Sequence, residues 1–288
     1  MNEFDYNTAF SRNLGWLSPE EQDQLKKSTV AIAGLGGVGG LYCTTLARFG
    51  VGHFKIADFD SFEIHNFNRQ HGSGMSTLGR KKFEVAKNQI LDINPDAKVE
   101  IFSEGITEQN MGEFISGSDL YLDGLDLFAL DIRQKVFAQL RVAQVPAVTV
   151  APMGMGASMM VFTKDSMSFD DYFALHKAKN FTEKTLRFAV SVAPSSMHLK
   201  YMVYRAAVDI EQKKVPSTPA GVALCAGVAA STAIKILLNR GCVYKAPWSL
   251  HYDAYLNKYK KSWRPWGHKN PLLRIKIKLA AMLIQRKS

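Results

Sequence analysis

The sequence predicts an α/β protein, a Rossmann-like, doubly wound and mainly parallel sheet with helices on both faces. The first observation is the segment VAIAGLGGVGG (30–40), in which a short apolar run leads into glycines at 34, 36 and 39 with G-x-G-x-x-G spacing. The second is the alternation of short apolar runs with longer segments of helical periodicity as far as residue 152. Such alternation is typical of a parallel sheet buried between helices.

Each element has local signals of its own. The helix after the glycine turn is expected to end at Gly50, and the next helix to stop before Pro95. Small apolar residues on nearly every side of 220–238 predict a buried helix. The expected strands are 30–33, 53–60, 98–102, 119–124 and 147–152, and the expected helices are 40–50, 79–94, 130–144 and 220–238. Segment 153–163 is expected to be a strand or a hairpin arm, and 197–210 is helix-like.

Charge divides the chain into a body and a tail. Ten of the 36 basic residues follow Asp253 and no acidic residue does, so the whole net charge of +10 belongs to the end of the chain. We expect one nucleotide-binding α/β domain at 1–253, with 164–218 as a less regular, substrate-side segment, and a basic, aromatic-containing tail at 254–288. Within the tail, LRIKIKL (273–279) alternates apolar and basic residues, which favours a strand over an amphipathic helix.

Several classes of protein are disfavoured. No segment reaches the roughly 18 uninterrupted apolar residues of a membrane span, and the amino terminus does not resemble a leader, so we expect a cytoplasmic protein without a transmembrane segment. The three cysteines, Cys43, Cys225 and Cys242, form no C-x-x-C pair, and the seven histidines lack metal-ligand spacing. We therefore expect no zinc.

The glycine turn suits NAD, FAD or ATP equally well, so the ligand must be chosen by other residues. Asp58 stands where an acid that binds a ribose belongs. Asn66, Arg69, Gln70 and Lys82 then supply donors suited to a triphosphate, and Asp126 a carboxylate suited to Mg²⁺. Hydride transfer needs neither donors for a triphosphate nor a carboxylate for Mg²⁺, so these residues favour ATP.

The ordered motifs GLGGVGG, ADFD, NFNRQ, GRKK and LDGLD together resemble the ThiF/MoeB family of adenylyltransferases, relatives of the ubiquitin-activating enzymes. The resemblance covers roughly residues 10–155 and the helix near 221–240. It implies that a carboxylate attacks the α-phosphorus of ATP to give an acyl-adenylate and pyrophosphate, with Mg²⁺ as cofactor and a homodimer as the assembly.

The resemblance also implies roles for individual residues. The phosphates would lie over Gly34, Gly36, Gly37 and Gly39, and the ADFD acids, Asp58 and Asp60, would lie at the nucleotide, with Asp58 on the ribose. Asn66, Arg69, Gln70 and Lys82 would bind the phosphates, Asp126 would carry the metal, and Arg12 would reach the partner subunit's ATP site. Arg69 and Lys82 could instead be solvated charges, and Asp58 could cap a turn. Leu127 stands where the family usually has Asn.

This sequence also departs from the family. Many members carry a catalytic cysteine between the positions of 151 and 219 and two C-x-x-C zinc pairs, and both are missing here. The expected function is therefore ATP-dependent activation of a carboxylate, on a carrier protein or a peptide C-terminus, without a thioester step. The alternatives are an enzyme like the tRNA threonylcarbamoyladenosine dehydratases, or a nucleotide-binding scaffold without turnover. The tail could dock on the body or on a second subunit, or bind nucleic acid, an acidic protein or a membrane surface.

Overall fold

The computed structural model describes residues 3–285 and divides the chain into two compact units. The first unit comprises Met1–Leu125 and Ala226–Val243, and the second comprises Asp126–Cys225 and Tyr244–Ser288. The two units are described separately below. Whether the chain functions as a body of 1–253 and a separate tail stays a prediction.

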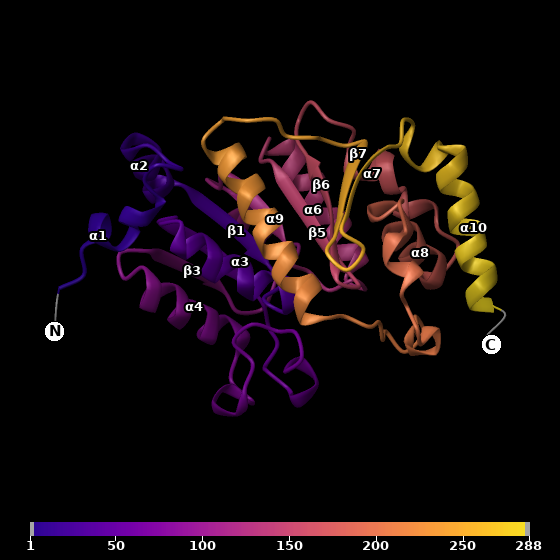
Figure 1. Cartoon of the computed structure of the whole chain (residues 1–288), viewed down its shortest axis with the longest axis horizontal. Helices are drawn as coiled ribbons and strands as arrows, with labels where there is room; N and C mark the ends of the chain where they lie inside the picture. The colour runs from indigo at the N-terminus through magenta and orange to yellow at the C-terminus, as the bar shows by residue number, and fades with distance from the viewer. Residues whose placement is uncertain (1–2, 286–288) are drawn as a thin grey trace. The chain divides into compact units, whose positions relative to one another are not determined.

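The first unit contains a parallel sheet with strand order β3-β2-β1-β4. This order is that of a nucleotide-binding Rossmann half, so the predicted α/β, Rossmann-like class is confirmed. Its strands are β1 (Thr29–Ala33), β2 (His53–Ala57), β3 (Lys98–Phe102) and β4 (Leu120–Asp123). Its helices are α1 (Tyr6–Phe10), α2 (Pro19–Lys27), α3 (Gly37–Arg48), α4 (Lys82–Ile93), α5 (Met111–Ile115) and the part of α9 (Pro219–Leu237) that follows Cys225. Figure 1 shows α3 and α4 side by side against these strands.

Apolar residues of β1 form the centre of the first unit. Residues 30–33 are fully buried, and the flanking strands β2 and β4 are buried over nearly their whole length. A buried central strand of a parallel sheet must be apolar on both faces, which explains the uninterrupted sequence VAIA. One 3₁₀ turn, Ser11–Asn13, lies between α1 and α2, and two more, Ile64–Asn66 and Met75–Thr77, lie between β2 and α4.

Helix α9 (Pro219–Leu237) confirms the predicted buried helix. Its alanines at 226, 229, 230 and 233 are all at most 2% exposed. Among the described residues it is the one helix whose length and hydropathy would allow it to cross a membrane, yet 56% of its apolar window is buried inside the protein. That burial is typical of the core helix of a folded domain.

The second unit contains four strands that pair antiparallel in the order β5-β6-β7-β8. They are β5 (Ala147–Met153), β6 (Gly156–Phe162), β7 (Trp248–Asp253) and β8 (Lys258–Trp263). The segment 153–163 is thus a hairpin arm, one of the two predicted possibilities. The helices are α6 (Leu130–Val142), α7 (Phe169–Phe173), α8 (Phe181–Val192) and α10 (Pro271–Gln285), with 3₁₀ turns at Leu175–Lys177, Met197–Lys200, Arg205–Ala207 and Gly267–Lys269.

Two predictions for this unit were wrong. Segment 197–210 is not one helix. It contains two short 3₁₀ turns, Met197–Lys200 and Arg205–Ala207, which residues 201–204 separate. The hydroxyl of Tyr201 accepts a hydrogen bond from the Met155 backbone N–H at 2.8 Å and donates one to Asp253 Oδ2 at 3.0 Å, so tertiary contacts fix this segment. Segment 273–279 is not a strand but the middle of α10.

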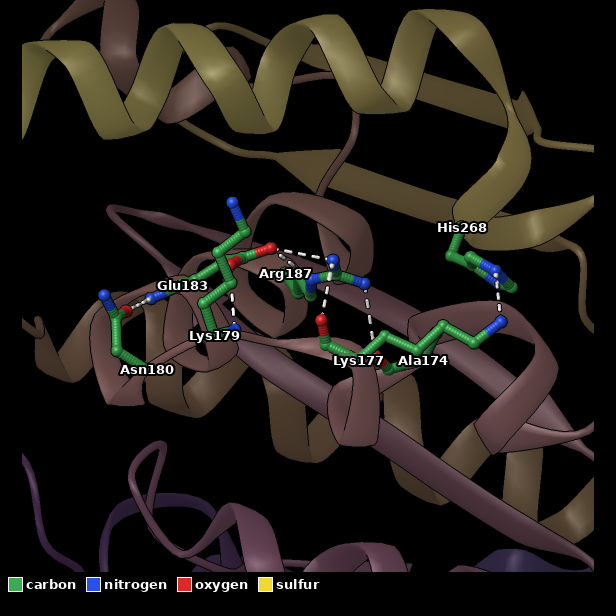
Figure 2. Close-up of polar contacts among 7 residues, drawn as sticks. All are labelled: Ala174, Lys177, Lys179, Asn180, Glu183, Arg187 and His268. Atoms are coloured by element: carbon green, nitrogen blue, oxygen red, sulfur yellow. Dashed lines mark hydrogen bonds and ion pairs between the residues drawn. The ribbon is translucent and has the colours of Figure 1, made fainter.

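A polar network fixes the chain between α7 and α8 (Figure 2). Arg187 donates from Nε to Oε1 of Glu183 at 2.9 Å, and its Nη atoms donate to the carbonyl oxygens of Ala174 and Lys177 at 3.2 and 3.3 Å. The other carboxylate oxygen of Glu183 accepts the backbone N–H of Lys179 at 2.9 Å. One partly buried ion pair therefore closes the turn that precedes α8.

Candidate nucleotide-binding site

The glycine turn lies at the carboxyl end of β1, where the strand order changes direction between β1 and β4. Gly34 has φ +82°, and a Cβ there would lie 2.3 Å from the carbonyl oxygen of Gly124. A Cβ on Gly39 would lie 1.8 Å from the carbonyl oxygen of Gly34. Both positions therefore require glycine, because the chain comes too close to itself for any side chain. Ligands of open α/β sheets bind at such a switch point.

The amino terminus of α3 is open at this turn. Gly36 is the N-cap and Gly37 the first helical residue, and no side chain caps the helix. The first N–H groups of a helix lack partners within the helix and carry partial positive charge, so they favour an anion. A Cβ on Gly36 would approach nothing nearer than the Gln70 side-chain amide at 3.5 Å, so the backbone of Gly36 is accessible beside Gln70.

The Gln70 side chain has unused hydrogen-bonding capacity. Its Oε1 atom is buried and has no hydrogen-bond partner in the described part of the chain. A buried amide oxygen without a partner carries a free-energy cost of about 1–3 kcal/mol, which a ligand or water that donates to it would offset. The predicted Gln70 thus lies next to the predicted Gly36, and the pair provides polar groups for a bound molecule.

Asp58 connects the end of β2 to the glycine turn. Its Oδ2 accepts the backbone N–H of Leu35 at 2.6 Å, and its Oδ1 accepts that of Asp60 at 2.7 Å. Burial raises the pKa of this carboxyl, while the Leu35 N–H and the Lys82 charge act in the opposite direction. Each carboxylate oxygen retains a second lone pair, so the predicted ribose contact is compatible with these bonds.

Lys82 is a buried cation at the first residue of α4. Its Nζ lies 2.8 Å from Oδ2 of Asp60, and its backbone N–H donates to the Asp60 carbonyl oxygen at 3.0 Å. Its charge also opposes the rise that burial causes in the pKa of Asp58, the residue that holds the turn. Residues from three motifs are therefore assembled around one end of the sheet: GLGGVGG, ADFD and GRKK.

Asn66 and Arg69 belong to the short turn that follows. Asn66 is 3% exposed, and its Oδ1 accepts the backbone N–H of Glu63 at 2.9 Å. Arg69 is half-buried and donates from Nη1 to the His65 carbonyl oxygen at 2.9 Å and to Oδ1 of Asn68 at 3.0 Å. These contacts order the NFNRQ segment, so the guanidinium of Arg69 is held by its own turn.

Two further predicted site residues, Arg12 and Asp126, are exposed. Arg12 is exposed in the 3₁₀ turn Ser11–Asn13, and its predicted role concerns a second subunit. Asp126 belongs to the second unit, where it is exposed and its Oδ1 accepts the backbone N–H of Phe128 at 2.9 Å, ahead of α6. The structure gives Asp126 a local turn-forming role, and metal binding by it stays a prediction.

The sequence reasoning missed two residues at the end of β4. Asp123 is 3% exposed and its Oδ1 accepts the backbone N–H of Leu125 at 3.3 Å. Gly124 donates its backbone N–H to the Ala33 carbonyl oxygen at 2.9 Å, and a Cβ on it would lie 2.2 Å from the Gly34 carbonyl oxygen. The available signal was an Asp-Gly pair at a strand end beside the switch point.

The three cysteines differ in their exposure. Cys43 and Cys225 are buried, and burial raises the pKa of both thiols, that of Cys43 to about 12. Cys242 is exposed.

Within residues 3–285, no three His, Cys, Asp or Glu side chains gather as a metal site would require. Mg²⁺ is commonly held by one or two carboxylates together with substrate phosphates, so such a cluster is not needed for it.

Comparison with known sequences decides the family. The sequence model of the ThiF family matches residues 10–274. The chain belongs to the ThiF family. This ThiF-family chain is 39% identical over 124 residues to the tRNA threonylcarbamoyladenosine dehydratase of Bacillus subtilis, covering 43% of this chain and 49% of that protein. It is 30% identical over 165 residues to the sulfur carrier protein ThiS adenylyltransferase of Escherichia coli, covering 57% and 64%.

A solved structure shows that the ThiF-family resemblance extends to the fold. Escherichia coli MccB, crystallised with MccA-N7isoASN, superposes with a TM-score of 0.68 at 18% identity, over 90% of this chain and 72% of that one. The curated sequence matches are shorter: the chain spans about half to two thirds of the length of the relatives named above. The family and the fold are thus established over most of the chain.

Proposed function

We propose that this protein is an ATP-dependent adenylyltransferase that activates the carboxylate of a carrier protein or peptide C-terminus without a thioester step. The observation that carries the proposal is the ion pair of buried Lys82 with half-exposed Asp60, beside the glycine turn that Asp58 holds. Relatives that share this family are named for adenylyl transfer to molybdopterin synthase and to the sulfur carrier protein ThiS.

The residues of the first unit fit a nucleoside triphosphate. The uncapped amino terminus of α3 supplies N–H groups for phosphate oxygens, and the unpartnered Oε1 of Gln70 can accept a hydrogen bond from the nucleotide or from water. Lys82 places a fixed positive charge at low exposure, where it acts more strongly than it would in water. Charge and positioning are what nucleotidyl transfer requires of a protein.

We assign each residue a task in binding and transfer. Asp58 orients the turn and accepts from the ribose hydroxyls, while Asn66, Arg69 and Lys82 neutralise charge that grows on the departing phosphates. Asp126 would hold Mg²⁺, which supplies further charge neutralisation at the phosphates when bound. Arg12 would contribute to the site of a partner subunit in a homodimer. The cytoplasm, where ATP is present, is the proposed compartment.

Binding of ATP tests the proposal most directly. Lys82→Ala should weaken binding of Mg²⁺-ATP by about tenfold or more in titration calorimetry, since one charge-assisted contact contributes about 1.5–3 kcal/mol. Lys55→Ala is the matched control: Lys55 is also buried in the first unit, but it donates to the carbonyl oxygens of Glu113 and Ser116. Binding of NADH without binding of ATP would refute the proposal. Binding of ATP without pyrophosphate exchange on any carboxylate would favour the scaffold function.

A second candidate function is that of a tRNA threonylcarbamoyladenosine dehydratase. It is favoured by the 39% identity to the Bacillus subtilis enzyme of that name and by the ten basic residues after Asp253, which suit a polyanion. The test is release of pyrophosphate from Mg²⁺-ATP with tRNA that carries the modified adenosine, against the same tRNA without it. Turnover with the modified tRNA alone would select this function over activation of a carrier.

A further inference from the structure

Helix α10 presents a continuous apolar stripe on its outer side. Leu273 is fully buried, and α10 packs along α8 in the second unit, as Figure 1 shows. Five other large apolar side chains are each between 53% and 59% exposed: Leu272, Ile275, Leu279, Met282 and Leu283. At 100° per residue these five fall within an arc of about 100°, which is the width of a whole helix face. The helix therefore has two apolar faces, and only one packs on the protein.

Basic residues border this stripe. Arg274 and Lys278 are exposed and fall on one flank of the arc, and Lys276 falls on the other, where its Nζ donates to the Pro194 carbonyl oxygen. Just before α10, Trp266 and Trp263 are 66% and 53% exposed. Residues 254–288 contain no acidic side chain. The surface thus combines exposed apolar residues, aromatic residues and positive charge.

The charges select the kind of partner. A second copy of this chain, placed stripe to stripe, would bring the basic flanks together with no acid in residues 254–288 to pair with them. A nucleic acid would satisfy the basic side chains but leave five large apolar side chains against a polyanion. An anionic lipid surface suits both the apolar stripe and the basic residues beside it. The stripe can contact acyl chains, and the basic residues can contact the headgroup phosphates.

We propose that α10 is an in-plane amphipathic helix that attaches this protein to anionic phospholipid membranes, with its apolar stripe at the level of the headgroups and Trp266 and Trp263 at the interface. The attachment is peripheral and reversible, since a single short helix without a covalent lipid binds membranes weakly. This inference concerns the second unit alone and is independent of the proposed adenylyl transfer.

Vesicle binding by the full chain tests the proposal. We expect the protein to co-sediment with vesicles of phosphatidylcholine containing about one third phosphatidylglycerol, and to bind pure phosphatidylcholine about tenfold less. Ile275→Glu with Leu279→Glu should reduce binding at least about tenfold. Val142→Glu with Val203→Glu is the matched control, because these residues are 77% and 98% exposed in the same unit and the charge change is identical. That control should bind as the parent does.

A second pair of variants tests the electrostatic contribution to vesicle binding. Arg274→Gln with Lys278→Gln should weaken binding and reduce its sensitivity to salt, whereas Lys27→Gln with Lys98→Gln, exposed in the first unit, should not. Failure to bind anionic vesicles would overturn the proposal, as would equal binding by the Ile275→Glu, Leu279→Glu variant. A dimer that this variant dissociates would instead make the stripe a self-association surface, and binding to nucleic acid but not to vesicles would make it a nucleic-acid site.

Discussion

Nζ of Lys82 lies 2.8 Å from Oδ2 of Asp60, and the lysine side chain is 6% exposed while that of the aspartate is 50% exposed. One member of the pair is therefore inside the protein and the other is half in water. Loss of the aspartate would leave an ammonium group buried without its partner, whereas loss of the lysine would leave only a partly solvated carboxylate. The two substitutions should therefore differ in their effect on stability.

Asp60→Asn should lower the free energy of unfolding by about 1–2 kcal/mol, a value reduced by solvent screening of the half-exposed carboxylate. Lys82→Met, which keeps much of the buried aliphatic stem, should cost less. Urea unfolding with circular dichroism measures both. Asp96→Asn provides the control, because Lys26 and Asp96 pair at 3.8 Å on the surface. An equal loss in all three variants would contradict this account.

Gly39→Ala should prevent stable folding or cost roughly 3 kcal/mol or more, because a Cβ there would lie 1.8 Å from the Gly34 carbonyl oxygen. Gly112→Ala in α5 should be neutral or stabilising by about 0.5–1 kcal/mol, since its Cβ would meet nothing within 4 Å and alanine favours the helix. Thermal unfolding of the two variants checks the contrast. A stable Gly39→Ala protein would show that the turn can open.

Gln70→Leu should leave the unfolding midpoint nearly unchanged and weaken Mg²⁺-ATP by about tenfold. The reason is that Oε1 of Gln70 is buried without a partner in the described structure, so its removal breaks no bond of the protein through that atom. Titration with ATP and a melting curve on the same sample separate the two effects. A large loss of stability with unchanged affinity would assign the amide a structural role.

Stability should fall as the pH decreases from about 6.5 to about 4. Burial and the neighbouring His198 lower the pKa of His251 to about 4, so between these pH values the unfolded chain binds a proton that the folded protein excludes. The full loss is roughly 3 kcal/mol. Burial also lowers the pKa of His198, which adds to the same window.

His251→Asn should flatten this dependence in urea unfolding at several pH values, while leaving the part due to His198. Ser195 Oγ lies 2.6 Å from Nδ1 of His251, and an asparagine amide can replace that contact. The exposed His176→Asn variant should keep the slope of the parent protein. An unaltered slope in His251→Asn would show that other groups cause the acid sensitivity.

Iodoacetamide should modify one cysteine in the folded protein. Cys242 is exposed, whereas Cys43 and Cys225 are buried with thiol pKa values raised by that burial. Mass spectrometry of the native and the unfolded protein should give one and three modified cysteines respectively, counted from the sequence. Rapid native modification of Cys43, which lies in α3 behind the glycine turn, would indicate opening of the first unit.

Sequence signals located the nucleotide-binding half well because they are local. The glycine spacing marks the start of α3, Pro95 follows the end of α4, and Lys82 opens that helix only three residues after its predicted start. What the sequence could not show is the pairing of distant groups. The bond from the Leu35 N–H to Asp58 joins residues 23 apart, and only the folded sheet brings them together.

The second unit was harder to predict, because the same sequence pattern is compatible with a strand or with a helix. LRIKIKL alternates as an exposed strand would, yet Leu272, Met282 and Leu283 on either side continue a helical period. The segment becomes a helix because one face packs on α8. The alternation arises because both faces carry apolar residues: Leu273 is buried on the packed face, whereas Ile275 and Leu279 are exposed on the other. For 197–210, the bonds of Tyr201 to Met155 and Asp253 override local helix preference.

The carboxyl half of α9 has a consequence for synthesis on the ribosome. Residues 226–243 belong to the first unit, where Gln24 donates to the Leu237 carbonyl oxygen and Arg240 pairs with Glu21 at 3.0 Å. The strands of this unit are complete at residue 123, but more than a hundred further residues must be synthesised before the carboxyl half of α9 can join the unit. Until then, a nascent polypeptide would expose the apolar surface of the first unit that α9 buries in the folded protein. Chaperones would be most needed during that interval.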